Sequence, residues 1–168
     1  MTEFQRLFLV QARSDFKVFE LLRQKCEDEK LPSCHALHYL QMATEKLAKA
    51  KAWKNGPIGE SHVAFGGFLK GLKSQRHIQK QLGYEGKNAS WMYLIKKCGP
   101  LAKEVEDLAP AVAKDGPNPE YPWPRAAPRS TPAEFEFGIW AKLHGTPNGN
   151  QFLKLVGGLF AVAETFLD

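Results

Sequence analysis

The chain has 168 residues, of which 43% are hydrophobic and 24% charged, a balance typical of one globular domain with a buried core. No apolar run approaches the roughly 18 residues of a membrane span, and the charged amphipathic start does not resemble a secretory signal, so we expect a cytoplasmic protein that does not enter the membrane. The three cysteines have no C-x-x-C spacing, which favours reduced thiols over a disulfide framework.

The formal net charge of +5 is unevenly distributed along the chain. Between Lys46 and Lys103, twelve basic residues stand against two acidic ones, a balance of +10, so the rest of the chain carries −5. Such a basic middle indicates a surface for a polyanion or a surface that complements the acidic ends. A set of solvated lysines without a partner explains the same pattern equally well.

The first predicted helix covers residues 3–30. Leu9, Ala12, Phe16 and Phe19 follow the spacing of three and four residues that places apolar side chains on one face. The connection over residues 29–32 is short, which predicts that this helix lies antiparallel to the next one.

The second predicted helix, residues 33–56, is the centre of the expected fold. It has one apolar stripe, formed by Ala36, Leu40, Ala43, Leu47 and Ala50. Ser33 is expected to cap its start, and the sequence Asn55-Gly56-Pro57 is expected to end it.

The next segments are predicted as shorter helices. Ser61 is expected to cap a third helix that ends near residue 75, in which the pair Gly66-Gly67 indicates either a closely packed neighbour or a short, broken helix. Residues 76–86 are expected to form a basic helical turn or loop that ends with Gly83 and Gly86. Residues 87–98 are again predicted to be helical, and Gly99-Pro100 is expected to interrupt that helix before its apolar spacing resumes.

The last third of the chain begins with a proline-rich stretch. Residues 117–132 hold six of the 11 prolines and predict a crossover loop that Tyr121 and Trp123 hold against the core. Thr131 and Glu134 form a capping-box pattern that predicts a helix start. A turn is expected at residues 145–150, before a final apolar helix from Phe152 to Phe166. No segment alternates as a strand would, so the predicted class is all-α.

Several short motifs carry a resemblance to a known family. The run from Ala43 to Ala50, ATEKLAKA, is similar to the "A-x-E-K-x-x-K-A" segment of the HEPN superfamily of small helical domains. Three further features resemble that family: the sequence ARSDF at residues 12–16, His62 where members often have a histidine before the third helix, and Tyr121-Pro122. The resemblance implies a single domain over residues 1–168, an antiparallel bundle of four to six helices with a proline-rich crossover loop.

The resemblance to HEPN domains also implies an expected function. Catalytic HEPN proteins share an R-x(4–6)-H motif, which serves as a metal-independent ribonuclease site, and this chain has no such spacing. The favoured hypothesis is therefore a non-catalytic module that binds nucleic acid, a nucleotide or a partner protein. The resemblance permits a role in a toxin–antitoxin or defence pair, with a nucleotidyltransferase as partner and with a homodimer. The alternative is a ribonuclease with a displaced site drawn from His62, Arg76 and His77, so whether the protein is an enzyme stays open.

Two groups of residues are candidates for ligand binding. Gln41, Glu45 and Lys49 lie along one side of the second helix, where they either form a groove or merely make an i,i+4 ion pair worth about 0.2–0.5 kcal/mol. The second group is expected to form one basic face and consists of Lys70, Lys73, Arg76, Lys80 and Lys87.

Metal and cofactor sites are not predicted. His35 and His38 have a spacing that suits a metal ligand pair, but no third ligand accompanies them. The chain also lacks the G-x-x-x-x-G-K-[ST] phosphate-binding loop. We therefore expect neither a metal nor a cofactor.

Overall fold

The computed structural model describes residues 1–53, 62, 64–123 and 130–167, and these residues form an all-α protein. They contain no β-strand, only one isolated bridge between Trp123 and Ser130. The predicted fold class is thereby confirmed, whereas the likeness to HEPN domains and the crossover function of the proline-rich loop remain predictions. No helix in the described ranges is both long enough and apolar enough to cross a bilayer.

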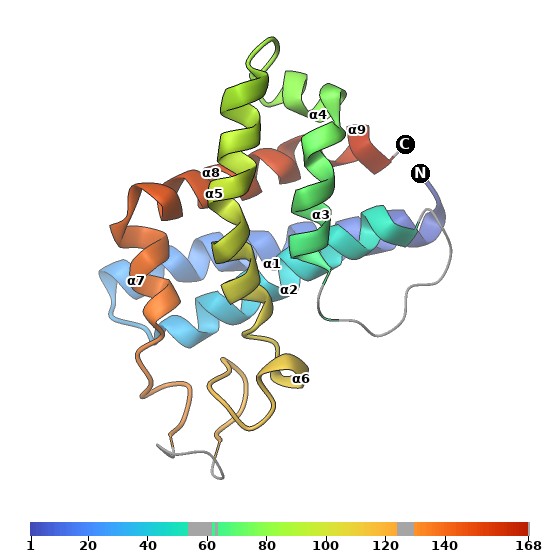
Figure 1. Ribbon diagram of the computed structural model, residues 1–168. Helices are drawn as coiled ribbons and strands as arrows, with labels where there is room; N and C mark the ends of the chain where they lie inside the picture. Colours follow the sequence, from blue (N-terminus) through green and yellow to red (C-terminus); the bar gives the residue numbers. More distant parts are fainter. Residues whose placement is uncertain (54–61, 63, 124–129, 168) are drawn as a thin grey trace.

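Helices α1 (Glu3–Asp28) and α2 (Ser33–Ala52) form the predicted antiparallel pair (Figure 1). A capping box fixes the start of α1, because the Gln5 amide donates to Thr2 Oγ1 while the Thr2 amide donates to Gln5 Oε1. The predicted cap of α2 is wrong: Pro32 occupies the cap position, and Ser33 is already the first helical residue. The expected stop at Asn55-Gly56-Pro57 lies outside the described residues.

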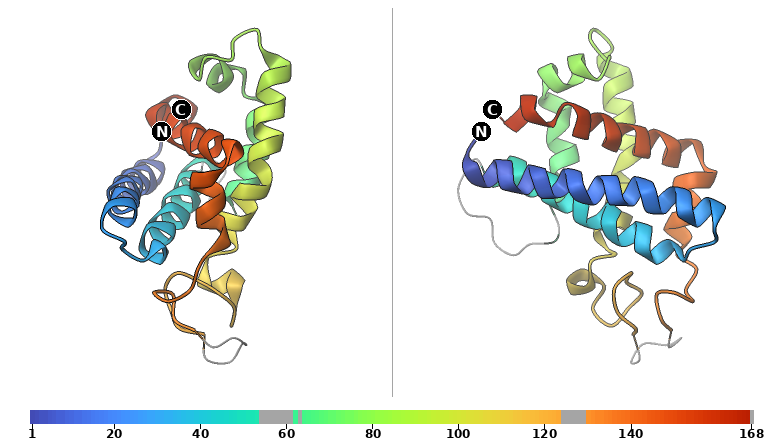
Figure 2. Two further views of the ribbon diagram at one scale, coloured as in Figure 1. Left: turned by 90° about the vertical axis from the view of Figure 1, so that its left-hand side faces the viewer. Right: turned by 180° about the vertical axis from the view of Figure 1, so that it is seen from behind.

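Helix α2 is the central element of the core. Ala36, Leu40, Ala43, Leu47 and Ala50 are all fully buried, which confirms the predicted stripe. Viewed from the side, α1 covers one flank of α2, and helices α3 and α5 lie beyond its other flank (Figure 2). Small residues alternate with leucine on this helix, so neighbouring helices can approach it on more than one side.

The chain next builds a pair of helices that cross the first pair. Helix α3 (Phe65–Gly71) continues into the short 3₁₀ helix η2 (Leu72–Ser74), and α4 (Arg76–Gln81) leads to α5 (Asn88–Glu106). In Figure 1, α3 and α5 run in opposite directions across α2. The indole Nε1 of the buried Trp91 donates to the Leu72 carbonyl at 3.1 Å and so connects α5 to η2.

The glycines of α3 and α5 can be compared with their predicted effects on these helices. Helix α3 is short, as one alternative for Gly66-Gly67 predicted, and a close neighbour is found at Gly66 alone: its amide donates to Glu106 Oε1 at 2.8 Å, whereas a Cβ atom on Gly67 would meet nothing within 4 Å. The expected interruption at Gly99-Pro100 is wrong, because α5 runs through both residues to Glu106. Pro100 is exposed, while buried residues before and after it keep both halves of the helix against the core.

The C-terminal part contains α6 (Pro110–Ala113), α7 (Gly138–Gly145), α8 (Pro147–Ala161) and α9 (Ala163–Leu167). The predicted capping box at Thr131 forms only a turn, in which the Glu134 amide donates to the Thr131 carbonyl, and α7 begins later. The turn expected over residues 145–150 is shorter than predicted: the chain leaves α7 after Gly145, and α8 already starts at Pro147 with Thr146 as its cap.

The expected anchors of the proline-rich stretch behave differently from each other. Trp123 is buried against the rings of Phe135 and Phe137, whereas Tyr121 is 60% exposed and does not hold the loop. Two of the six prolines, Pro124 and Pro128, lie outside the described residues.

The two ends of the described chain meet. The rings of Phe16 on α1 and Phe160 on α8 stack with centroids 4.4 Å apart, and Arg13 forms an ion pair with Glu164 at 2.7 Å. Figure 1 shows the N- and C-termini side by side at the same edge of the molecule. Helices α1, α2 and α8 thus form the body of the protein, and α3 and α5 lie across it.

Candidate nucleic-acid interface

The first candidate group, on α2, forms an internal network. Glu45 is 7% exposed and accepts hydrogen bonds from three side chains: Gln41 Nε2 at 2.7 Å, Lys49 Nζ at 2.6 Å and, when its Nδ1 carries the proton, His62 at 3.1 Å. The structure therefore brings Gln41, Glu45 and Lys49 together, as their spacing predicted. It also shows the i,i+4 ion pair between Glu45 and Lys49.

This network changes the acidity of the Glu45 carboxyl group. Burial alone would raise its pKa, but hydrogen bonds from Lys49, Gln41 and His62, together with the charge of Lys49, outweigh burial and hold the pKa below its usual 4.5. Glu45 is accordingly ionised at neutral pH, and its oxygens are occupied by donors from the same chain.

The other charged residue of the HEPN-like run is also engaged internally. Lys46 Nζ lies 2.6 Å from Asp15 Oδ2, and the Asp15 carboxylate is almost completely buried between α1 and α2. Lys46 and Asp15 therefore join the first two helices, while Glu45 joins α2 to His62 before α3 and Lys49 pairs with Glu45 within α2. The polar residues of this motif stabilise the helical scaffold.

The three catalytic candidates are not gathered into one site. His62 precedes α3, whereas Arg76 and His77 begin α4, at the other end of the segment formed by α3 and η2 (Figure 1). The His62 side chain is 40% exposed, and its contact among the described residues is Glu45. The displaced Arg/His pair of the ribonuclease hypothesis thus has no supporting contact in the described structure.

The members of the predicted basic face take different positions. Lys70 and Lys73 line one cleft beside α5, whereas Lys87 lines a separate hollow next to α8. Lys80 forms an exposed ion pair with Glu85 at 2.8 Å, and Arg76 is an exposed residue of α4. Of the five, Lys70 and Lys73 are the ones that share a concave surface.

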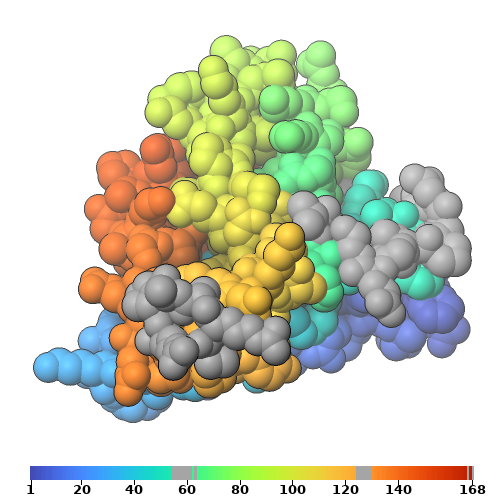
Figure 3. Space-filling model, turned by 60° about the horizontal axis from the view of Figure 1, so that its bottom comes forward, coloured from blue at the N-terminus to red at the C-terminus, as the bar shows by residue number. Residues whose placement is uncertain are grey.

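That surface, the α3–α5 cleft, has a volume of about 540 Å³. Its rim carries four lysines, Lys70 and Lys73 from the α3–η2 segment and Lys96 and Lys103 from α5. Gly67 and Gly99 help to form it, because a Cβ atom on either residue would meet nothing within 4 Å. Figure 3 shows α3 in green beside α5 in yellow-green on this face.

Charge in the cleft is predominantly positive and available to a ligand. Lys70, Lys73 and Lys96 are exposed and form no ion pair with any described residue, while Lys103 pairs with Asp107. The buried Glu106 lies at one end of the cleft, where its carboxylate is held by the Gly66 amide. Three ammonium groups outside any such ion pair, against this one carboxylate, favour an anionic ligand.

Lys96 and Lys103 were not among the predicted binding residues. The sequence groups lysines by their neighbourhood along the chain, but the cleft joins residues of two segments, α3–η2 and α5, through the antiparallel packing of α3 against α5. One signal for it was present: Lys96 and Lys103 are seven residues apart and so lie on one face of α5, as do Gly99 and Lys103.

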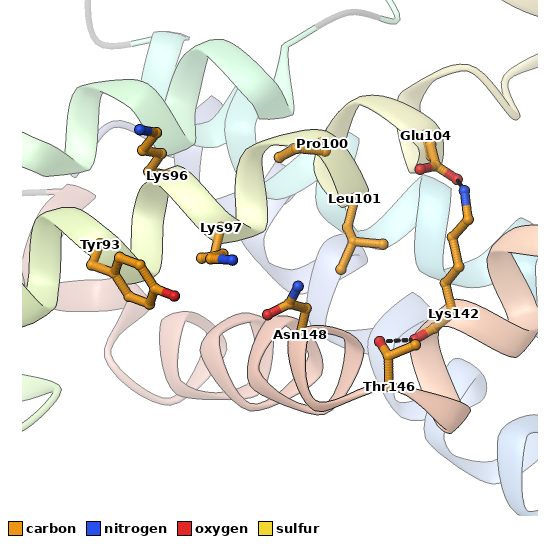
Figure 4. Close-up of a pocket in the computed structure, with 9 residues that line it drawn as sticks. All are labelled: Tyr93, Lys96, Lys97, Pro100, Leu101, Glu104, Lys142, Thr146 and Asn148. Atoms are coloured by element: carbon orange, nitrogen blue, oxygen red, sulfur yellow. Dashed lines mark hydrogen bonds and ion pairs between the residues drawn. The ribbon is translucent and has the colours of Figure 1, made fainter.

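A second concavity adjoins the first on the other side of α5. This α5–α8 hollow has a volume of about 710 Å³ and shares Lys96 and Pro100 with the cleft. Figure 4 shows its lining, with Tyr93 and Lys97 from α5 opposite Asn148 from the start of α8. Its one acidic side chain, Glu104, forms an ion pair with Lys142 at 2.7 Å.

Groups suited to metal or thiol chemistry are not assembled in the described parts. No three His, Cys, Asp or Glu side chains lie close enough there to hold a metal ion. His38 instead lies 3.3 Å from Glu120. Burial raises the pKa of Cys98 to about 12, so its thiol stays protonated near neutral pH.

No protein-family model, curated protein or solved structure matches this chain. Indications of function therefore come from the geometry of the two concave surfaces.

Proposed function

We propose that the protein is a non-catalytic binding module that engages nucleic acid through the α3–α5 cleft. The observation that supports this most directly is the set of four lysines around one concavity, three of them without an ion pair to any described residue. Phosphate contacts made by lysine supply most of the sequence-independent affinity for nucleic acids. A HEPN-like domain would be a suitable scaffold for such a module.

The proposal is tested by the salt dependence of binding to a labelled single-stranded RNA, measured by fluorescence anisotropy. Each phosphate that a lysine neutralises contributes about 0.7 to the slope of log affinity against log salt concentration. The double variant Lys73→Glu/Lys96→Glu should bind more weakly and with a smaller slope. A control, Lys17→Glu/Lys154→Glu, carries the same charge change on exposed residues outside the cleft and should bind nearly as the parent does.

A second variant tests the shape of the cleft without changing its charge. Gly99→Leu fills the open space beside Gly99 and places a better helix former in α5, so it should reduce binding while leaving helical circular dichroism intact. Equal loss in the two double variants, or full binding by Gly99→Leu, would contradict the proposed site. Progressive shortening of the RNA, lost in His62→Ala, would instead favour the ribonuclease hypothesis.

A further inference from the structure

The α5–α8 hollow contains an aromatic side chain that the fold does not use. The ring of Tyr93 is 58% exposed on α5, and its hydroxyl makes no hydrogen bond to a described residue. Lys97 Nζ lies 5.3 Å from the centre of this ring, a cation–π distance. An exposed aromatic ring beside lysines combines the two elements with which proteins bind unpaired bases.

Three neighbouring concavities, linked by shared lining residues, offer an extended ligand a path over α5. The α3–α5 cleft and the α5–α8 hollow share Lys96, and the hollow shares Tyr93 with a further concavity of about 470 Å³ that reaches Tyr84. A ligand following this path would meet lysines first and tyrosines afterwards. A flexible chain can follow such a path across α5, whereas a rigid duplex would span it without entering.

The polar groups of the hollow suit a base that stacks on Tyr93. Asn148 lies opposite Tyr93 and Lys97 in Figure 4, and its amide can both donate to and accept from a base edge. Lys97, beside the ring, is placed to contact a phosphate next to that base, and Lys96 lies between the hollow and the α3–α5 cleft. Glu104 does not oppose them, because Lys142 already neutralises its carboxylate.

From these observations we infer that the α5–α8 hollow is a base-stacking subsite centred on Tyr93, which makes the protein select single-stranded nucleic acid over duplex. This inference rests on the proposed function, since the lysines of the α3–α5 cleft supply the adjoining phosphate contacts. Every base has a π-face, so the subsite would confer strand selectivity with little sequence preference.

The test compares four probes of matched length on the full chain: single-stranded RNA, single-stranded DNA, duplex RNA and inorganic polyphosphate. Parent protein should bind the single strands more tightly than the duplex or polyphosphate, and the ratio of RNA to DNA affinity identifies the preferred sugar. Tyr93→Ala should weaken single-strand binding by roughly 5- to 150-fold, the value of one stacked base, and leave polyphosphate binding unchanged. Tyr93→Phe, which keeps the ring, should retain most of the affinity.

The matched control is Tyr121→Ala, which removes an equally exposed tyrosine far from the hollow in sequence and outside its lining. It should bind all four probes as the parent does. The inference is overturned if Tyr93→Ala binds single strands normally, or if it loses polyphosphate to the same extent. Failure of the proposed function looks different: the parent then binds no polyanion at low salt, and the lysine variants change nothing.

Discussion

Lysines occur in two contrasting regions of this molecule. On α2, Lys46 and Lys49 are largely buried, and each lies within 2.6 Å of a carboxylate that is itself buried. Around the α3–α5 cleft, Lys70, Lys73 and Lys96 are exposed and have no ion-pair partner among the described residues. The first group is committed to holding helices together, whereas the second keeps its charge available to a ligand.

The contrast shows why a resemblance based on charged residues can mislead about function. Glu45, Lys46 and Lys49 form the polar part of the HEPN-like run, yet all three are satisfied within the chain. Substituting any of these three residues should therefore lower the stability of the fold. The lysines that we propose as ligand contacts lie in segments that carry no recognised motif.

The largest expected effect is on the buried network. Glu45→Ala leaves Lys49 as a buried cation without its partner, which should lower the free energy of unfolding by about 3–5 kcal/mol in urea denaturation. The control Glu85→Ala breaks the fully exposed pair with Lys80 and should cost about 0–1 kcal/mol. Similar losses in the two variants would mean that the α2 network is not buried in solution.

The next effect is a dependence of stability on acid pH. The pKa of Glu45 is lower in the folded protein than its usual 4.5, so its contribution is fully present above that value. The contribution should decline as the pH falls below 4.5 and through the pKa of the folded state. In Glu45→Gln, the decrease in thermal stability over this acid range should be shallower than in the parent, and an equal slope would contradict the network.

The smallest expected effect on stability is at the cleft. Lys96→Ala removes an exposed side chain without an ion pair and should change the free energy of unfolding by no more than about 0.5 kcal/mol. Its effect should appear in binding, where the salt slope for single-stranded RNA should decrease by about 0.7. A marked loss of stability would place Lys96 with the buried lysines of α2.

Sequence reasoning succeeded where local pattern and packing agree. The stripe on α2 and the extent of α1 follow from apolar spacing, and both are observed. It failed where tertiary packing decides. Proline is a poor helix residue, but Pro100 lies on the exposed side of α5, so the core contacts on either side keep the helix continuous. Thr131 has a good capping pattern, yet the rings of Phe135 and Phe137 pack against Trp123 before a helix begins.

Only part of the candidate site could be predicted from the sequence. Lys70 and Lys73 could be chosen because they belong to a basic stretch of sequence. Lys96, Lys103 and Tyr93 could not be joined to them, since the angle at which α5 crosses the first helices follows from core packing and has no local signature. Glycines in both helices, Gly67 and Gly99, were the remaining clue, but the sequence Gly99-Pro100 predicted a helix interruption and not a concave surface.

The pairing of α1 with the last helices has a consequence for the order in which the chain can complete its core during synthesis. Arg13 and Glu164 are 151 residues apart in sequence, and Phe16 stacks on a ring from α8. The α1–α2 hairpin can form as soon as both helices have left the ribosome, because its contacts are local. The apolar face around Phe16 stays uncovered until translation of the C-terminal helices is almost finished. The nascent chain therefore carries an exposed apolar surface until α8 has been made, and truncation before α8 should yield an aggregation-prone fragment.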